Sequence, residues 1–220
     1  MECLIGIQFK NFVLLASDRV NVHSIIIFKS DVDKIKPLGD YLAMGVNGEP
    51  GDAIQFSEYI SKNIQLYTMR NGYELSPTAA ATYIQRNLAN YLRSRTPYMV
   101  NLLVAGYDTQ TNEAQLHYLD YLGSCTRVPF GMHGYGAFFV LGLMDKIYKE
   151  ESTLEEGVEM MRKCVTEIQK RLVINLPAFK VCVIDKDGRR NLPDIVIDPV
   201  KIDTVGATPT PANELTPMVH

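Results

Sequence analysis

Two oppositely charged residues near the start of this 220-residue chain are the best placed to do chemistry together. Asp18 ends the apolar segment Leu14-Leu15-Ala16-Ser17, and Lys34 follows sixteen residues later, after two further extended segments. A carboxylate and an ammonium group on neighbouring strands can form an ion pair, worth at most about 1 kcal/mol when exposed and more consequential when buried. The spacing alone assigns them no catalytic role.

The cysteines and histidines show no grouping typical of a metal or nucleophilic site. The sequence contains no C-x-x-C pair, and no histidine lies at metal-ligand spacing from a cysteine. We therefore expect no metal site and no disulfide framework, but free thiols in a reducing compartment, at Cys3, Cys125, Cys164 and Cys182. The four histidines are scattered as well, at positions 23, 117, 133 and 220.

A glycine pair before an apolar segment, Gly134-Tyr135-Gly136, has some likeness to a phosphate-binding loop. It lacks the lysine of a P-loop and the longer glycine fingerprint of a dinucleotide site. Entry into a helix is the simpler interpretation, and no cofactor is expected.

The elements that must position these residues alternate between two periodicities. Residues 4–8, 12–17, 22–28 and 41–46 are rich in branched and aromatic side chains and predict strands. A helix is then predicted by apolar residues at spacings of three and four, and a second one begins at Ser76-Pro77, a capping hydroxyl followed by proline. The first stripe comprises Ala53, Phe56, Ile60, Ile64 and Tyr67.

The second half repeats this order. Residues 99–107 and 114–119 predict a strand pair, and residues 137–148 a helix so apolar that we expect it to be covered on several sides. The spacing Ser152-x-x-Glu155 predicts a capping box for another helix, and strands are expected at 179–184 and 194–197. The order is strands, two helices, strands, two helices, strands. This favours an α+β fold, with two antiparallel sheets face to face and helices outside, over a doubly wound parallel sheet.

Composition excludes several classes of protein. A net charge of −3 with 46% hydrophobic residues gives no sign of nucleic-acid binding, and no apolar run approaches the roughly 20 residues that span a membrane. We expect a single domain over residues 1–200. Residues 201–220 are poor in apolar side chains and predict a disordered tail, although a partner-binding arm remains open.

Five segments of the chain resemble the β subunits of the 20S proteasome, over roughly residues 1–197. They include Ala16-Ser17-Asp18-Arg19 and the long run from Asn71 to Ala80; the others are residues 2–7, 48–52 and 92–98. The resemblance implies the four-layer αββα sandwich of the N-terminal-nucleophile hydrolases. In active members an N-terminal threonine attacks the peptide carbonyl with help from its own amine, a lysine and an aspartate. Asp18 and Lys34 match the two supporting positions, and Gly48 matches the glycine whose N–H serves the oxyanion hole.

The resemblance breaks down at the nucleophile. Counted back sixteen residues from Asp18, its position is Glu2, whose carboxylate cannot replace a hydroxyl, and Met1 would block its amine. Three further supporting positions also depart from the family. Leu172 stands for an aspartate, and Asn175 and Tyr135 stand for serines. We therefore expect a chain without catalytic residues, in which Asp18, Lys34 and Gly48 are vestigial.

Cys3 is the main enzymatic alternative, because N-terminal cysteines act as nucleophiles in other hydrolases of this fold. Trimming of Met1 and Glu2 would expose it. It lies one residue late relative to Asp18, however, and a shift of one residue in a strand turns the side chain to the opposite face. A small apolar strand residue is the simpler interpretation.

The resemblance also implies partners and a location. A non-catalytic β subunit of this family would join other β subunits and α subunits in four stacked rings of seven, enclose the proteolytic chamber, and reside in the cytoplasm and nucleus. A trimmed hydrolase and a standalone binding protein are the alternatives. Neither a nucleic acid nor a membrane is expected as a partner.

Overall fold

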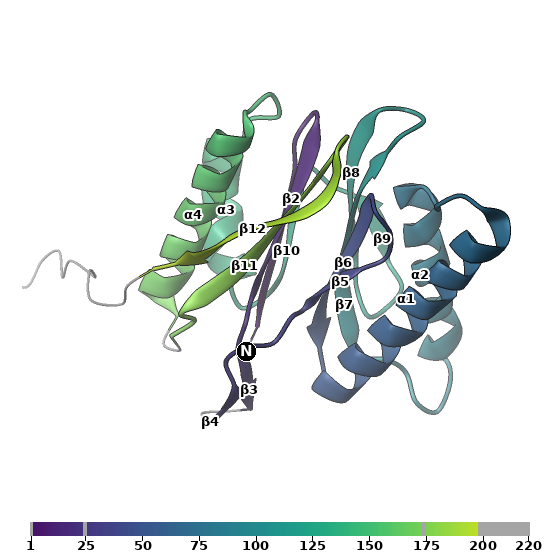
Figure 1. Ribbon diagram of the computed structural model, residues 1–220. Helices are drawn as coiled ribbons and strands as arrows, with labels where there is room; N and C mark the ends of the chain where they lie inside the picture. The colour runs from purple at the N-terminus through teal and green to yellow at the C-terminus, as the bar shows by residue number, and fades with distance from the viewer. Residues whose placement is uncertain (1, 24–25, 173–174, 198–220) are drawn as a thin grey trace, which may run out of the picture.

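The computed structural model describes residues 2–23, 26–172 and 175–197. They form four layers, with a pair of helices on each outer side of two facing five-stranded sheets (Figure 1). The predicted C-terminal tail lies outside the described residues. None of the helices in the described ranges is long and apolar enough to cross a membrane.

The first sheet has the strand order β10-β1-β2-β11-β12, and all its pairs are antiparallel. The second has the order β5-β6-β7-β8-β9, also antiparallel. The first sheet contains β1 (Cys3–Gln8), β2 (Phe12–Asp18), β10 (Phe130–Gly134), β11 (Ala178–Asp185) and β12 (Gly188–Val196). The second contains β5 (Ile35–Pro37), β6 (Leu42–Gly48), β7 (Val100–Asp108), β8 (Glu113–Leu119) and β9 (Cys125–Arg127).

Each sheet is covered by one pair of helices. The helices α1 (Pro50–Asn71) and α2 (Pro77–Leu92) pack on the second sheet, and α3 (Ala137–Ile147) and α4 (Leu154–Arg171) pack on the first (Figure 1). Three apolar clusters result, one under each helix pair and one between the sheets. The sheets approach closely because Gly45 leaves room for Leu4, where an added Cβ would lie 2.5 Å from a Leu4 methyl carbon.

Most predicted elements are present, and the apolar stripes face the core. Phe56, Ile60 and Ile64 of α1 are buried, and the hydroxyl of Ser76 accepts the N–H of Ala79 at the start of α2. The strand predicted at 22–28 is instead a small hairpin of β3 (Asn21–His23) and β4 (Ile26–Lys29), with residues 24–25 outside the described ranges. Short strands at β5, β9 and β10 were not predicted.

Two predictions about the second helix pair were wrong. The capping box of α4 is formed by Thr153 and Glu156, one residue later than predicted, because Ser152 instead donates to the carbonyl of Lys149. The apolar helix α3 is not covered on several sides within this chain. Only one of its faces meets α4 and the sheet, and Phe138 is 82% exposed.

The edge strand β12 contains a bulge at Pro193 and Asp194, which together stand opposite Lys180. The extra residue changes the phase of the strand. Leu192 and Ile195, which an unbroken strand would point to opposite faces, therefore both join the apolar cluster under α3 and α4.

Candidate functional site

Four of the residues singled out from the sequence meet at one end of the two sheets. Asp18 is the last residue of β2, Gly48 the last residue of β6, and Glu2 immediately precedes β1. Lys34 immediately precedes β5. The β3–β4 hairpin projects from this same end of the sandwich (Figure 1).

Asp18 and Lys34 form the buried ion pair at the centre of the site. Lys34 Nζ lies 2.7 Å from Asp18 Oδ2, and the two side chains are 8% and 0% exposed. Asp18 also accepts the backbone N–H groups of Cys3 at 2.8 Å and Val20 at 3.1 Å. The carboxylate is thus held by one ammonium group and two amides, an arrangement that compensates its removal from water.

The carboxylate of Glu2 closes the site from the opposite side of Lys34. Its Oε1 lies 3.1 Å from Lys34 Nζ, and its Oε2 accepts the N–H of Gly48 at 3.2 Å. Gly48 has a φ of 152°, and a Cβ at this position would collide with the carbonyl of Met99. A glycine is therefore required where the backbone N–H meets the Glu2 side chain.

The loop that carries Lys34 is held to the first sheet by side chains that sequence reasoning missed. Lys180 Nζ pairs with Asp33 at 2.6 Å, and Arg19 pairs with both Asp31 at 2.9 Å and Asp194 at 2.6 Å. The hydrogen bond to Asp194 and the negative charge of that carboxylate raise the pKa of the Arg19 guanidinium. These partners are separated by up to 175 residues, so no local spacing could have revealed them.

The remaining predicted positions lie apart from the contacts that join Glu2, Asp18, Lys34 and Gly48. Leu172 packs against the apolar cluster at the end of α4, and Asn175 is exposed. Tyr135 is 54% exposed and follows Gly134, which pairs with Cys3. Within the described ranges, the side-chain hydrogen bonds of Glu2, Lys34 and Asp18 go to none of these three residues.

Cys3 points away from the Glu2 side chain. It joins the cluster under α3 and α4, whereas Leu4 faces the space between the sheets. Burial, and then the charge of Asp18, raise the pKa of the Cys3 thiol to about 12. A thiol of this kind is protonated at neutral pH and is a poor nucleophile.

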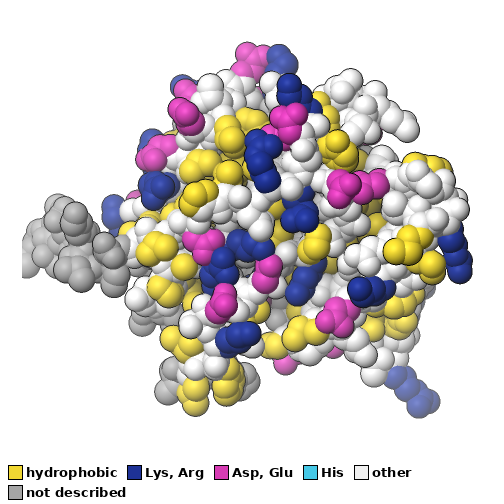
Figure 2. All heavy atoms as spheres, in the orientation of Figure 1, with side chains coloured by type: hydrophobic (Ala, Val, Ile, Leu, Met, Phe, Trp, Pro, Cys, Tyr) yellow, Lys and Arg dark blue, Asp and Glu magenta, His cyan; other side chains and the backbone are white. Residues whose placement is uncertain are grey.

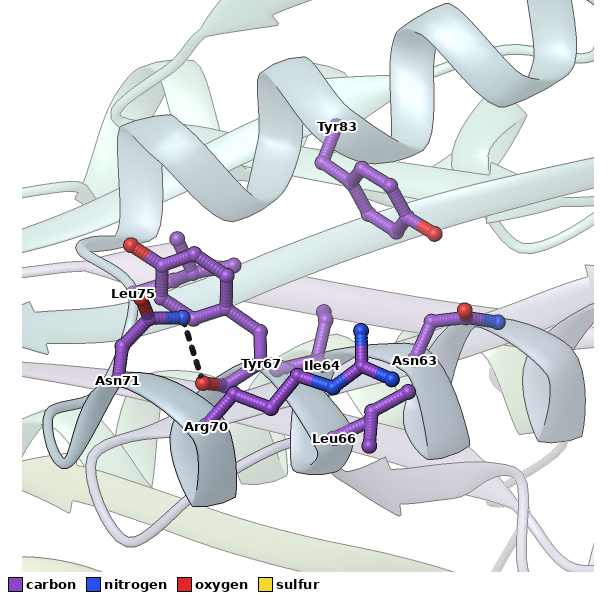
Figure 3. A pocket seen from close by; sticks show the side chains of 8 residues that line it. All are labelled: Asn63, Ile64, Leu66, Tyr67, Arg70, Asn71, Leu75 and Tyr83. Carbon is purple, nitrogen blue, oxygen red and sulfur yellow. Dashed lines mark hydrogen bonds between the residues drawn. The ribbon is translucent and has the colours of Figure 1, made fainter.

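Of the cavities on the described surface, one borders this site and another lies towards the far end of α1. The first, of about 440 Å³, is lined by Glu2 and Lys34 together with residues of the β3–β4 hairpin and the start of α1. The other, of about 300 Å³, lies between α1 and α2, with Tyr67, Tyr83 and Arg70 around it (Figure 3). Its lining holds no acid–base pair. No group of three or more potential metal ligands occurs among the residues the structure describes.

The family model for proteasome subunits matches residues 2–184, which include Glu2, Asp18, Lys34 and Gly48. The chain belongs to the proteasome subunit family. Proteasome subunit beta type-4 of Saccharomyces cerevisiae is 40% identical over 194 residues, which cover 88% of this chain and 98% of that protein. Proteasome subunit beta type-2-B of Arabidopsis thaliana is 44% identical over 190 residues, covering 86% and 94% respectively. A probable proteasome subunit beta type-4 of Schizosaccharomyces pombe is 43% identical over 192 residues, covering 87% and 99%.

This membership confirms the resemblance found in the sequence and the αββα sandwich of the N-terminal-nucleophile hydrolase type. The relatives are β subunits of types 2 and 4. The arrangement around Lys34 is an ammonium group between two carboxylates and beside a backbone N–H. In the described part of the chain, Lys34 Nζ donates to the Asp18 carboxylate and the Val20 carbonyl and pairs with the Glu2 carboxylate, rather than with a hydroxyl or thiol. Ser17, the hydroxyl next to Asp18 in sequence, is fully buried.

Proposed function

We propose that this chain is a non-catalytic structural β subunit of the 20S proteasome core. It takes a place in a ring of seven β subunits, within four stacked rings of α and β subunits, and forms part of the wall of the proteolytic chamber. The proposal includes residence in the cytoplasm and nucleus, as the resemblance implies. The observation that carries it is the Glu2 carboxylate at the nucleophile position, bound to both Lys34 and Gly48.

The contacts of Glu2 with Lys34 and Gly48 support the absence of catalysis. Peptide-bond hydrolysis by this fold needs a nucleophile that Lys34 can activate and an N–H free to bind the developing oxyanion. Here a carboxylate occupies the position of the nucleophile, and its second oxygen takes the N–H of Gly48. One residue therefore removes both requirements.

A trimmed hydrolase that uses Cys3 finds little support in the geometry. The Cys3 side chain is 1% exposed and packs on the helix side of the first sheet. Its backbone nitrogen, which would become the free amine, donates to Asp18. Activation would require the strand to turn over and leave its pairing with β2 and β10.

Exposed apolar side chains support a role in an assembly. Ile26 and Ile27 of the hairpin are 57% and 54% exposed, and yellow side chains gather at the bottom left of Figure 2, where the hairpin lies. Phe138 of α3 and Met69 of α1 are 82% and 81% exposed. Such residues on several faces fit a subunit with several neighbours better than a monomer.

Mass spectrometry of the native assembly tests the proposal. We expect the chain to retain Glu2, to occur in particles of hundreds of kilodaltons together with α and β subunits, and to take up no peptide electrophile at its first residues. A chain that begins at Cys3 and carries an adduct there would show that it is a hydrolase. A stable monomer as the native form would contradict the assembly role.

A further inference from the structure

The ammonium group of Lys34 lies close to oxygen atoms of three different residues. Nζ donates hydrogen bonds to Asp18 Oδ2 at 2.7 Å and to the carbonyl of Val20 at 2.8 Å, and it forms a further ion pair with Glu2 Oε1 at 3.1 Å. A lysine ammonium has three donors and no acceptor. Two of them are used by Asp18 and Val20, so removal of the Glu2 carboxylate would take away the second counter-ion of Nζ and leave its third donor open to another acceptor.

The same removal would release a second donor beside the first. Gly48 N–H donates to the other oxygen of the same carboxylate, at 3.2 Å. The two donors come from the loop before β5 and from the end of β6, and neither belongs to the strand that follows Glu2. Both are held in place by other contacts, since Lys34 keeps Asp18, and Gly48 pairs with Val100.

The Lys34 side of the site is accessible from solvent. The site opens onto the cavity of about 440 Å³ that Glu2 and Lys34 line. An anion of carboxylate size can therefore reach Lys34 from solvent, at the position from which the Glu2 carboxylate also accepts the N–H of Gly48.

We propose that Glu2 is a tethered ligand of a small-carboxylate site formed by Lys34 Nζ and Gly48 N–H, and that a free carboxylate such as acetate binds there when the Glu2 side chain is shortened. In the natural chain the tether keeps the site filled and excludes other carboxylates. The ion pair of Lys34 with Asp18 persists without Glu2, so the shortened variant keeps the charge of Lys34 compensated. The inference concerns binding at this site and does not rest on the assembly role proposed above.

Acetate titration of the full chain and its Glu2→Ala variant tests the proposal. Binding to the folded state alone raises the unfolding temperature in a ligand-dependent way. In Glu2→Ala we expect the unfolding temperature to rise with sodium acetate and to level off, while sodium chloride at equal ionic strength has no such effect. The amide resonance of Gly48 should shift in the same range of acetate concentration.

Two matched variants make the test specific. Glu49→Ala removes an exposed neighbouring carboxylate that caps no helix N–H, and it should respond to acetate no more than the natural chain. Glu2→Gln keeps an amide in the site and should also fail to bind acetate. The proposal is wrong if Glu2→Ala shows no acetate-dependent shift of Gly48, or if Glu49→Ala or Glu2→Gln responds as strongly.

Refolding tests the same proposal if Glu2→Ala does not fold in chloride. The variant is then refolded in acetate and in chloride at equal ionic strength. A tethered ligand that can be replaced predicts recovery of folded chain in acetate only. Equal failure in both salts would show that Glu2 supports the fold in another way and would overturn the proposal.

Discussion

The backbone N–H of Cys3 donates to Oδ1 of Asp18 at 2.8 Å, at the point where β1 begins and β2 ends. The other oxygen of Asp18 accepts Lys34 and the N–H of Val20. One carboxylate therefore joins the first strand, the turn after β2 and the loop before β5. Asp18 has this structural task whether or not any chemistry takes place beside it.

Replacement of Asp18 by alanine should destabilise the chain strongly. It leaves Lys34 buried without its nearest counter-ion and two backbone amides without an acceptor, which costs about 3–5 kcal/mol in comparable buried pairs. Denaturant unfolding measures the loss. Asp31→Ala is the matched control, because Asp31 also pairs with a basic residue but is 81% exposed, and an exposed pair is worth about 1 kcal/mol or less. Equal losses in the two variants would contradict the structural role of Asp18.

The cap of α4 predicts a difference between two adjacent hydroxyl residues. Thr153 accepts the N–H of Glu156, whereas Ser152 donates to a carbonyl outside the helix. Thr153→Ala should lower the free energy of unfolding by about 1 kcal/mol, as the loss of an N-cap does. Ser152→Ala should have a smaller effect. The reverse order would restore the capping box predicted from the sequence.

Buried His133 should make the chain less stable in mild acid. Burial lowers its pKa to about 4, and its ring stacks on Tyr118 with centroids 4.1 Å apart. In the unfolded chain the histidine binds a proton near pH 6.5, so the folded state loses stability as the pH falls from about 6.5 towards 4. The full effect amounts to about 3 kcal/mol, from the difference in pKa.

A His133→Gln variant isolates this effect. Its free energy of unfolding should depend less on pH between 4 and 6.5 than that of the natural chain, and the two curves should run parallel above pH 7. His117, whose pKa burial also lowers, remains in both proteins and contributes equally. Curves that run parallel down to pH 4 would show that His133 is not the group responsible.

The four thiols should differ in their reaction with an alkylating reagent. Cys3, Cys164 and Cys182 are buried, whereas Cys125 is partly exposed. Burial raises the pKa of all four thiols, and that of Cys164 reaches about 12. We expect iodoacetamide to label Cys125 first and the other three only on unfolding, as followed by peptide mass spectrometry. Early labelling of Cys3 would revive the nucleophile alternative.

The sequence predicts a helix or strand well where apolar residues recur at a regular spacing. It predicts less where contacts with distant parts of the chain determine the structure. The stripe of α1 predicted its buried face, because helical spacing alone places those residues on one side. The prediction that α3 is covered on several sides was wrong for this chain, because an apolar composition does not show which side of a helix meets a neighbour. The short strand β9 has no clear alternation of apolar and polar residues, and it is a strand because it pairs with β8.

The candidate site was likewise predictable only in part. The supporting roles of Asp18, Lys34 and Gly48 came from a family resemblance, because no local pattern assigns a shared role to residues that lie sixteen and thirty positions apart. Glu2 was predicted as the occupant of the nucleophile position. That its two oxygens would bind two different donors depends on how the ends of the sheets meet, and only the structure shows it.

The bulge at Pro193 affects how the first sheet ends as well as which side chains it buries. β12 is an edge strand, and an edge with a regular row of free N–H and C=O groups is a template for a further strand. Proline contributes no N–H, the bulge breaks the row, and the positive charges of Arg189 and Arg190 lie earlier on the same strand. These features make the edge a poor template for a further strand, from a second copy of the chain or from another protein.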